Sequence, residues 1–144
     1  MFVLRRNPLT VAFGLQTREQ YIERTSPPYA ALMHLINELP QDARIYSLFE
    51  PRSYALPRFV QPDVINSNFS HDLYYQITAS GIINYWKTEG YTHILINNTG
   101  ANLESNDPES QFTPAAKDAL RNVISMLELV GQTPEAVYSI FKIP

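Results

Sequence analysis

Two short runs of β-branched, aromatic and aliphatic residues place the strongest constraint on this fold. RIYSLF covers residues 44–49, and YTHILIN covers residues 91–97. The apolar residues of the second run are nearly continuous, a pattern typical of a strand buried on both faces of a parallel sheet. We therefore expect two neighbouring strands of an α/β sheet. Open α/β sheets bind ligands beyond the carboxyl ends of their strands, which here places a site after residue 49.

Helical patterns occupy most of the chain around these two runs. Residues 29–39 carry apolar side chains at three- and four-residue spacing, which predicts an amphipathic helix. A second helix is expected over residues 71–88, with Ser70 as its N-cap. A third is expected to begin at Thr113, followed by Pro114 at the first helical position, and to end at Gly131. In the second helix these side chains are expected to face inward: Tyr74, Ile77, Gly81 and Tyr85.

Weaker signals cover the remaining segments. Thr17 and Gln20 have the spacing of a capping box for a short helix that runs through Arg24, and residues 9–15 are apolar enough to be extended. Residues 58–61 lie among prolines and predict only a brief strand at a sheet edge. Residues 98–111 read as a polar loop. Residues 136–143 alternate and carry a lysine, which favours a strand near an edge.

The length of 144 residues fits one domain, which we expect to cover residues 9–144. The order of strands and helices predicts a three-layer, Rossmann-like α/β fold, with a small, mostly parallel sheet flanked by helices. Residues 1–8 contain a brief apolar patch and two arginines. We interpret them as an N-terminal stub, which either is a plain chain start or follows a removed membrane segment.

Composition argues against several classes of function. The formal net charge is −3 and the basic residues are scattered, so nucleic acid is not expected as a partner. The absence of cysteine excludes disulfides, thiolate metal sites and cysteine nucleophiles. Five dispersed glycines form neither a dinucleotide-binding nor a phosphate-binding loop, and no two of the three histidines have metal-ligand spacing. We therefore expect no cofactor, no metal and no catalytic residue.

The loop after residue 49 contains the most attractive candidate ligand site. Glu50, Arg52 and Tyr54 offer a carboxylate, a guanidinium and a phenol at the expected end of a strand. Such groups hydrogen-bond to sugars and to phosphate-bearing ligands. The competing interpretation is a local ion pair between Glu50 and Arg52 that pins the loop.

Asp63 and the adjacent pair His71 and Asp72 form a second candidate cluster. A histidine beside carboxylates is able to bind a cation or to transfer protons. Helix capping and a favourable interaction with the helix dipole equally account for His71 and Asp72. Asp63 and His71 therefore join Glu50, Arg52 and Tyr54 as tentative ligand-binding residues.

A series of motifs resembles a known group of membrane enzymes. LTVAFGLQTREQYIER is followed by INELPQDARIYSLFEPRSYAL and later by GYTHILIN. This series resembles the soluble C-terminal region of bacterial multi-pass glycosyltransferases of family 39, which are related to the dolichyl-phosphate-mannose protein mannosyltransferases. The match covers most of the chain from residue 9 onward.

The resemblance implies a parent enzyme that takes a sugar from a polyprenyl-phosphate donor. This chain would then be a non-catalytic accessory domain on the extracytoplasmic face of a bacterial membrane, helping to position acceptor or donor. Its partners would be the membrane-embedded part of the parent and a carbohydrate or lipid-linked sugar. One alternative is a free-standing α/β binding module for a sugar or small anion. Another is a small hydrolase or transferase that uses Asp63, His71 and Asp72.

Overall fold

Five strands form one sheet, in the order β2-β1-β3-β5-β4, in the computed structural model, which describes residues 9–144. The expected N-terminal stub at residues 1–8 lies outside the described residues. Strand β1 pairs in parallel with β2 and β3, whereas β5 is antiparallel to both β3 and β4. Four strands therefore share one direction, which confirms the small, mostly parallel sheet. The strands are β1 (Ile45–Leu48), β2 (Val60–Gln61), β3 (His93–Asn97), β4 (Glu128–Gln132) and β5 (Tyr138–Lys142).

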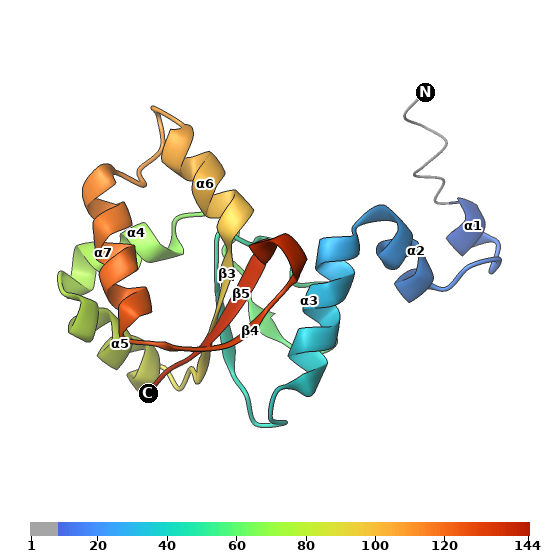
Figure 1. Cartoon of the computed structure of the whole chain (residues 1–144), viewed down its shortest axis with the longest axis horizontal. Coiled ribbons are helices and arrows are strands. Elements are labelled where there is room, and N and C mark those ends of the chain that lie inside the picture. Colours follow the sequence, from blue (N-terminus) through green and yellow to red (C-terminus); the bar gives the residue numbers. More distant parts are fainter. Residues whose placement is uncertain (1–8) are drawn as a thin grey trace.

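Helices cover both faces of the sheet and complete three layers (Figure 1). Helix α3 (Pro27–Glu38) lies on one face, as the apolar spacing in residues 29–39 predicts. Helices α4 (Asn68–Gln76), α5 (Ala79–Thr88) and α7 (Pro114–Ser125) lie on the other. The Rossmann-like three-layer prediction is therefore confirmed.

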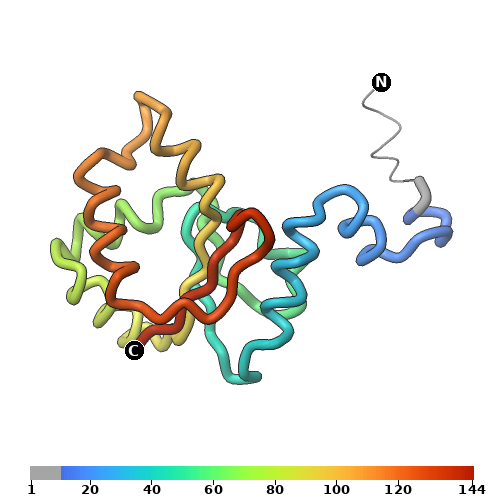
Figure 2. The backbone as a smooth tube through the Cα atoms, viewed as in Figure 1, coloured from blue at the N-terminus to red at the C-terminus, as the bar shows by residue number. Residues whose placement is uncertain are grey.

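The chain before α3 extends away from this body, as the backbone tube makes clear (Figure 2). It contains α1 (Leu9–Ala12) and α2 (Arg18–Thr25). The predicted capping box is present, because the Thr17 hydroxyl accepts from the Gln20 backbone N–H while the Gln20 side chain accepts from the Thr17 backbone N–H. The expectation of an extended segment over residues 9–15 is wrong for α1. Helix α2 contributes no fully buried residue, but Ile22 packs against the apolar cluster around α3, and the cap adds local stability.

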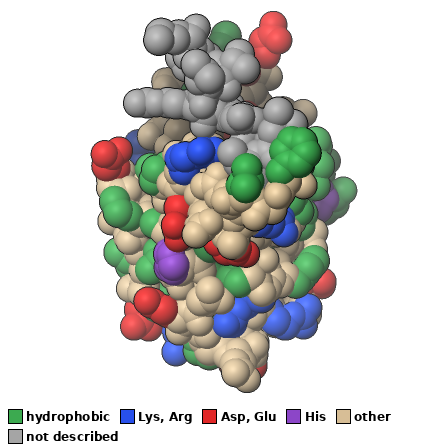
Figure 3. Space-filling model, turned by 90° about the vertical axis from the view of Figure 1, so that its right-hand side faces the viewer, with side chains coloured by type: hydrophobic (Ala, Val, Ile, Leu, Met, Phe, Trp, Pro, Cys, Tyr) green, Lys and Arg blue, Asp and Glu red, His purple; other side chains and the backbone are tan. Residues whose placement is uncertain are grey.

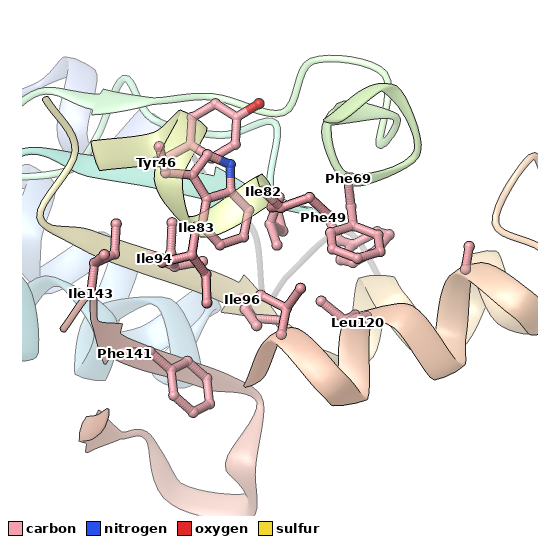
Figure 4. Close-up of a cluster of buried hydrophobic side chains, with 14 of the residues drawn as sticks. Tyr46, Phe49, Phe69, Ile82, Ile83, Ile94, Ile96, Leu120, Phe141 and Ile143 are labelled. Carbon is pink, nitrogen blue, oxygen red and sulfur yellow. The ribbon is translucent and has the colours of Figure 1, made fainter. Parts of the chain in front are cut away.

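The larger apolar core fills the space between the sheet and the helices α4, α5 and α7 (Figure 4). Trp86 of α5 and Phe69 of α4 are fully buried there, against alternate residues of the strands. The other strand residues face α3, where Leu32 and Ile36 pack on Ile45. Burial on both faces explains why the runs at residues 44–49 and 91–97 are apolar at nearly every position. The strand residues in the larger core are Tyr46, Leu48, Ile94, Ile96 and Phe141.

The single helix expected over residues 71–88 is two helices. The first begins earlier, at Asn68, so Ser70 is not its N-cap. The break lies at Ile77, whose φ of 61° is the left-handed conformation, and the Thr78 hydroxyl then caps α5 by accepting from the Gly81 N–H. The expected inner face is divided by this break: Tyr74 and Ile77 are both 78% exposed, whereas Tyr85 is partly buried and packs against the larger core.

The last third of the chain also differs from expectation. The helix beginning at Thr113 ends at Ser125, and residues 128–132 form the edge strand β4 rather than a further helical turn. Residues 98–111 are not a plain loop, because α6 (Asn98–Asn106) follows directly from β3, capped by the Asn97 side chain. A 3-10 turn, η2 (Pro134–Ala136), then leads into β5. Strand β5 lies between β3 and the edge strand β4, one position from the edge of the sheet.

The end of the molecule that carries α2 and α3 has a mixed surface (Figure 3). Among the described residues visible on this face, acidic, basic and hydrophobic side chains are interspersed, without a broad region of one charge. No described helix has both the length and the apolar character required to cross a bilayer.

Candidate functional site

Glu50 forms a closed polar corner at the carboxyl end of β1. Its side chain is 1% exposed, and five donors point at its two oxygens. Oε1 accepts from the backbone N–H and Nε of Arg52, both at 2.8 Å. Oε2 accepts from Arg52 Nη2 and Asn97 Nδ2, both at 3.0 Å, and from the Tyr138 hydroxyl at 2.9 Å. A carboxylate offers about four lone pairs, so the acceptors of Glu50 are all occupied. We call these four residues the Glu50 corner.

Aromatic residues hold Arg52 in this corner. Its guanidinium lies 5.2 Å from the ring centre of Tyr29, whose hydroxyl donates to the Arg52 carbonyl at 2.8 Å. Arg52 Nη2 also donates to the Tyr138 hydroxyl at 2.7 Å. Burial, reinforced by the Glu50 charge, raises the pKa of Tyr29 to about 12 and that of Tyr138 above its usual value. Both phenols therefore stay neutral at physiological pH.

Tyr54 does not join the Glu50 corner. Its side chain is 80% exposed, and the guanidinium of Arg18 lies 5.6 Å from its ring centre. Arg18 also donates to the Tyr54 carbonyl at 3.0 Å, which fastens α2 to this loop. Tyr54 and Arg52 do line one small hollow of about 130 Å³ together with Tyr21. That volume is below the 300–1,000 Å³ of ordinary ligand pockets.

Asp63 ties β1 to the start of α4. Its side chain is fully buried, and it accepts the backbone N–H of Phe49 at 2.8 Å, of Ser67 at 2.9 Å and of Asn68 at 3.1 Å. Burial raises the pKa of Asp63, while these three hydrogen bonds oppose the shift. The carboxylate occupies the position of a helix cap, which agrees with the dipole of α4.

His71 lies in a groove that the sequence did not predict. The groove has a volume of about 490 Å³ and is lined by residues of the short edge strand β2 and of helices α4 and α5, among others. A second hollow of about 250 Å³ continues it and shares His71, Asp72 and Tyr85. We call the two together the tyrosine groove. The lining residues relevant to binding in the larger part are Tyr46, Asn68, His71, Asp72, Tyr85 and Tyr91, and the smaller part adds Tyr75.

Asp72 is the buried polar centre of the tyrosine groove. Its side chain is 1% exposed, and its Oδ2 accepts from the indole N–H of Trp86 at 2.8 Å. His71 Nδ1 lies 3.5 Å from the other oxygen. Burial raises the pKa of Asp72, and the hydrogen bonds from Trp86 and His71 oppose that shift.

Pairs of aromatic rings in contact form the walls of the tyrosine groove. The ring centres of Tyr46 and Tyr91 are 4.8 Å apart, and those of His71 and Tyr75 are also 4.8 Å apart. Tyr46 in turn lies 6.0 Å from Trp86 in the core. Such tilted pairs are favourable arrangements of aromatic rings and keep the groove walls in place.

The structure thus separates the five predicted site residues. Glu50 and Arg52 pair in the Glu50 corner, Tyr54 lies outside it, Asp63 is a helix anchor, and His71 faces the tyrosine groove. Sequence reasoning missed further members of these sites because they come from distant segments: Tyr138 lies 86 residues from Arg52, and Trp86 lies 14 residues from Asp72. No local spacing could have indicated them. These missed members are Tyr46, Tyr85, Trp86, Asn97 and Tyr138.

Within residues 9–144, no three histidine or carboxylate side chains are grouped to hold a metal ion. Chemically, the tyrosine groove offers flat apolar rings beside hydrogen-bonding groups. No protein-family model, no curated protein and no solved structure matches this chain.

Proposed function

We propose that this chain is a non-catalytic accessory domain of a membrane glycosyltransferase that uses a polyprenyl-phosphate sugar donor. In this proposal the domain lies on the extracytoplasmic face of a bacterial membrane and holds a sugar of the acceptor or donor in the tyrosine groove. The motif series from residue 9 onward supports the enzyme class. The groove supports the binding role.

One observation carries the binding role: aromatic side chains and polar groups line the same groove. Sugar rings present flat C–H surfaces and a rim of hydroxyls, which pack on aromatic rings and exchange hydrogen bonds with carboxylates, amides and imidazoles. Tyr75, Tyr85 and Tyr91 supply rings, while His71 and Asn68 supply polar groups at the rim. Ligand pockets commonly combine an apolar lining with a few placed polar groups.

The groove is held in place before any ligand binds. Asp72 is fixed by the Trp86 indole, and Tyr46 is wedged between Trp86 and Tyr91. These contacts connect the buried base of the groove to the larger core, so this part of the groove is already ordered before a ligand binds. By contrast, the Glu50 corner has its acceptors filled and positions the chain rather than a ligand.

Two exposed tyrosines give a matched test of the groove. Tyr75 is 64% exposed and lines the groove, whereas Tyr54 is 80% exposed and lies outside it. We expect sugars titrated into the full chain to shift the amide resonances of His71, Asp72 and Tyr85. The Tyr75→Ala variant should bind roughly three- to tenfold more weakly, as the loss of one aromatic contact predicts. Tyr54→Ala should bind like the parent.

Failure of every tested mono- and oligosaccharide to shift groove resonances would refute the sugar-binding role. Equal loss in Tyr54→Ala and Tyr75→Ala would show that the groove is not the site. The glycosyltransferase part has its own test in the genomic reading frame, which should encode membrane helices upstream of these residues. A reading frame that begins at Met1 without such helices would instead favour the free-standing binding module.

A further inference from the structure

A second, larger hollow adjoins the tyrosine groove. It measures about 580 Å³ and lies where β1 and β2 begin, at the end of the parallel strands opposite to the Glu50 corner. We call it the arginine hollow. It shares Gln61 and Tyr91 with the tyrosine groove, so the two are neighbours across the short strand β2. The side chains that bear on its chemistry are Gln41, Arg44, Arg58, Phe59, Gln61 and Tyr91.

Two arginines without a carboxylate partner line the arginine hollow. Neither Arg44 nor Arg58 forms an ion pair with any carboxylate in residues 9–144. No acidic side chain of the described residues lines the hollow either. Arg52 and Arg121, in contrast, are each paired with a carboxylate. The charged side chains that line this hollow are therefore both basic, although the whole chain has a net charge of −3.

Each guanidinium group has a partner beside the hollow. Arg58 donates to the carbonyl oxygens of Pro40 and of Leu39, the latter at 3.2 Å, just beyond the end of α3. Arg44 lies over Tyr91, with its guanidinium carbon 5.6 Å from the ring centre. Gly90 makes room for it, because a Cβ at that position would lie 2.5 Å from Arg44 Nη1.

Guanidinium groups are suited to oxyanions. The planar fork of arginine matches the oxygens of carboxylates and phosphates. The fork of Arg58 is already oriented by two carbonyl oxygens, so it loses less entropy when it binds. The guanidinium of Arg58 has five N–H donors, and two carbonyl oxygens each accept one hydrogen bond from it. The other N–H groups remain available for another acceptor. Gln41 and Gln61 add neutral amide donors to the same hollow.

We propose that the arginine hollow is an oxyanion subsite that continues the tyrosine groove, so that the ligand of this domain is an acidic saccharide. The sugar ring occupies the tyrosine groove, and its carboxylate or phosphate ester binds Arg44 and Arg58. This inference rests on the proposed sugar-binding role of the groove. The shared chemistry is a sugar that carries an oxyanion, and uronic acids and sugar phosphates are its two sources.

The test compares glucose, glucuronate, glucose 6-phosphate and inorganic phosphate, each titrated into the full chain at an ionic strength of about 20 mM and again at about 300 mM. We expect at least one acidic sugar to bind roughly tenfold more tightly than glucose at low salt, with amide shifts at both Arg44 and His71. This advantage should shrink at high salt, because Arg44 is exposed. The stronger of the two acidic sugars identifies the source of the anion.

Matched arginine variants separate a specific subsite from a general charge effect. Arg44→Gln should abolish the tenfold advantage and leave glucose binding unchanged, whereas Arg44→Lys should keep only part of it. Arg121→Gln removes the same charge from an exposed ion pair with Asp118 on α7 and should have no effect. Circular dichroism of each variant confirms that the fold is retained.

The outcomes distinguish this inference from the proposed function. If glucose and the acidic sugars bind in the groove with equal affinity, the oxyanion subsite is refuted and the sugar-binding role stands. If no sugar binds, both are refuted. If glucose 6-phosphate shifts Arg44 no more strongly than inorganic phosphate does and leaves His71 unshifted, the hollow binds anions without a sugar. The acidic saccharide is then refuted.

Discussion

Replacement of Arg52 by alanine is the sharpest test of the Glu50 corner. The substitution removes two side-chain hydrogen bonds to Glu50, from Nε at 2.8 Å and Nη2 at 3.0 Å. It also removes the donor to the Tyr138 hydroxyl. The Glu50 carboxylate stays buried and keeps the Arg52 backbone N–H, Asn97 and Tyr138 as donors.

The expected loss follows from these contacts. A hydrogen bond to a charged group contributes about 1.5–3 kcal/mol, and the Arg52 side chain is 50% exposed, so water replaces part of what is lost. The lower value applies to each of the two bonds, which gives a loss of about 3 kcal/mol in the free energy of unfolding. A domain of this size has roughly 5–15 kcal/mol in total. The melting temperature should therefore fall by roughly 6–12 °C.

Trp86 provides the assay, because it is the only tryptophan and is fully buried in the larger core. Urea unfolding followed by its fluorescence gives the free energy of unfolding of each variant. Arg121→Ala is the matched control, since its ion pair with Asp118 is exposed on both sides and contributes at most about 0.5 kcal/mol. The double variant Glu50→Gln with Arg52→Ala should recover about 1–2 kcal/mol, because a neutral amide replaces the unpaired buried charge.

Two results would refute this account of the corner. A loss in Arg52→Ala no larger than that in Arg121→Ala would show that the Glu50–Arg52 pair contributes nothing beyond a surface pair. A double variant less stable than Arg52→Ala would show that the cost does not arise from a buried charge left without its partner.

Three further predictions concern α4, α5 and α2. Because burial raises the folded-state pKa of Asp72, the folded chain binds this proton more tightly than the unfolded chain, and stability is lost as pH rises from the ordinary value of 3.8 through the folded pKa. In urea unfolding, the free energy of unfolding of Asp72→Asn minus that of the parent should therefore be more favourable at pH 7 than at pH 4. If this difference in stability does not depend on pH, the pKa shift is contradicted. Ile77→Gly should raise the free energy of unfolding by roughly 0.5–1 kcal/mol, because Ile77 has a φ of 61°, which glycine adopts without strain, and its side chain is exposed. The control Tyr74→Gly, within helix α4, should lose about 1 kcal/mol. A similar loss in Ile77→Gly would contradict backbone strain at Ile77. Thr17→Ala should speed hydrogen exchange in residues 18–25 by removing about 1 kcal/mol of local cap, without changing global unfolding; unchanged exchange would show that the cap is not needed.

The sequence was informative wherever the signal was local. The capping box at Thr17 and the apolar spacing in residues 29–39 each involve partners three or four residues apart, and α2 and α3 form as predicted. The runs at residues 44–49 and 91–97 are apolar because both of their faces are covered, and they pair in parallel as predicted. A pattern that arises from burial on both faces identifies a central strand without knowledge of its partners.

Elements defined by distant partners were not predictable in this way. Strand β4 is largely exposed, so its residues lack the apolar alternation of a strand, and its conformation comes from backbone pairing with β5. The break at Ile77 is likewise set by packing, since α4 and α5 must each turn a face to the larger core. Both features depend on contacts that a local pattern does not contain.

The sites show the same division. The sequence by itself determined that Glu50 and Arg52 lie together at the end of a buried strand, because they are two residues apart. Only the tertiary structure decided that Asn97 and Tyr138 fill the remaining acceptors of Glu50, which makes this corner structural. It also decided that His71, Tyr85 and Tyr91 share a groove and that Arg44 and Arg58 face a neighbouring hollow. Side chains from separate segments come together only when the sheet places those segments side by side. The spacing of residues along the chain therefore does not reveal such sites.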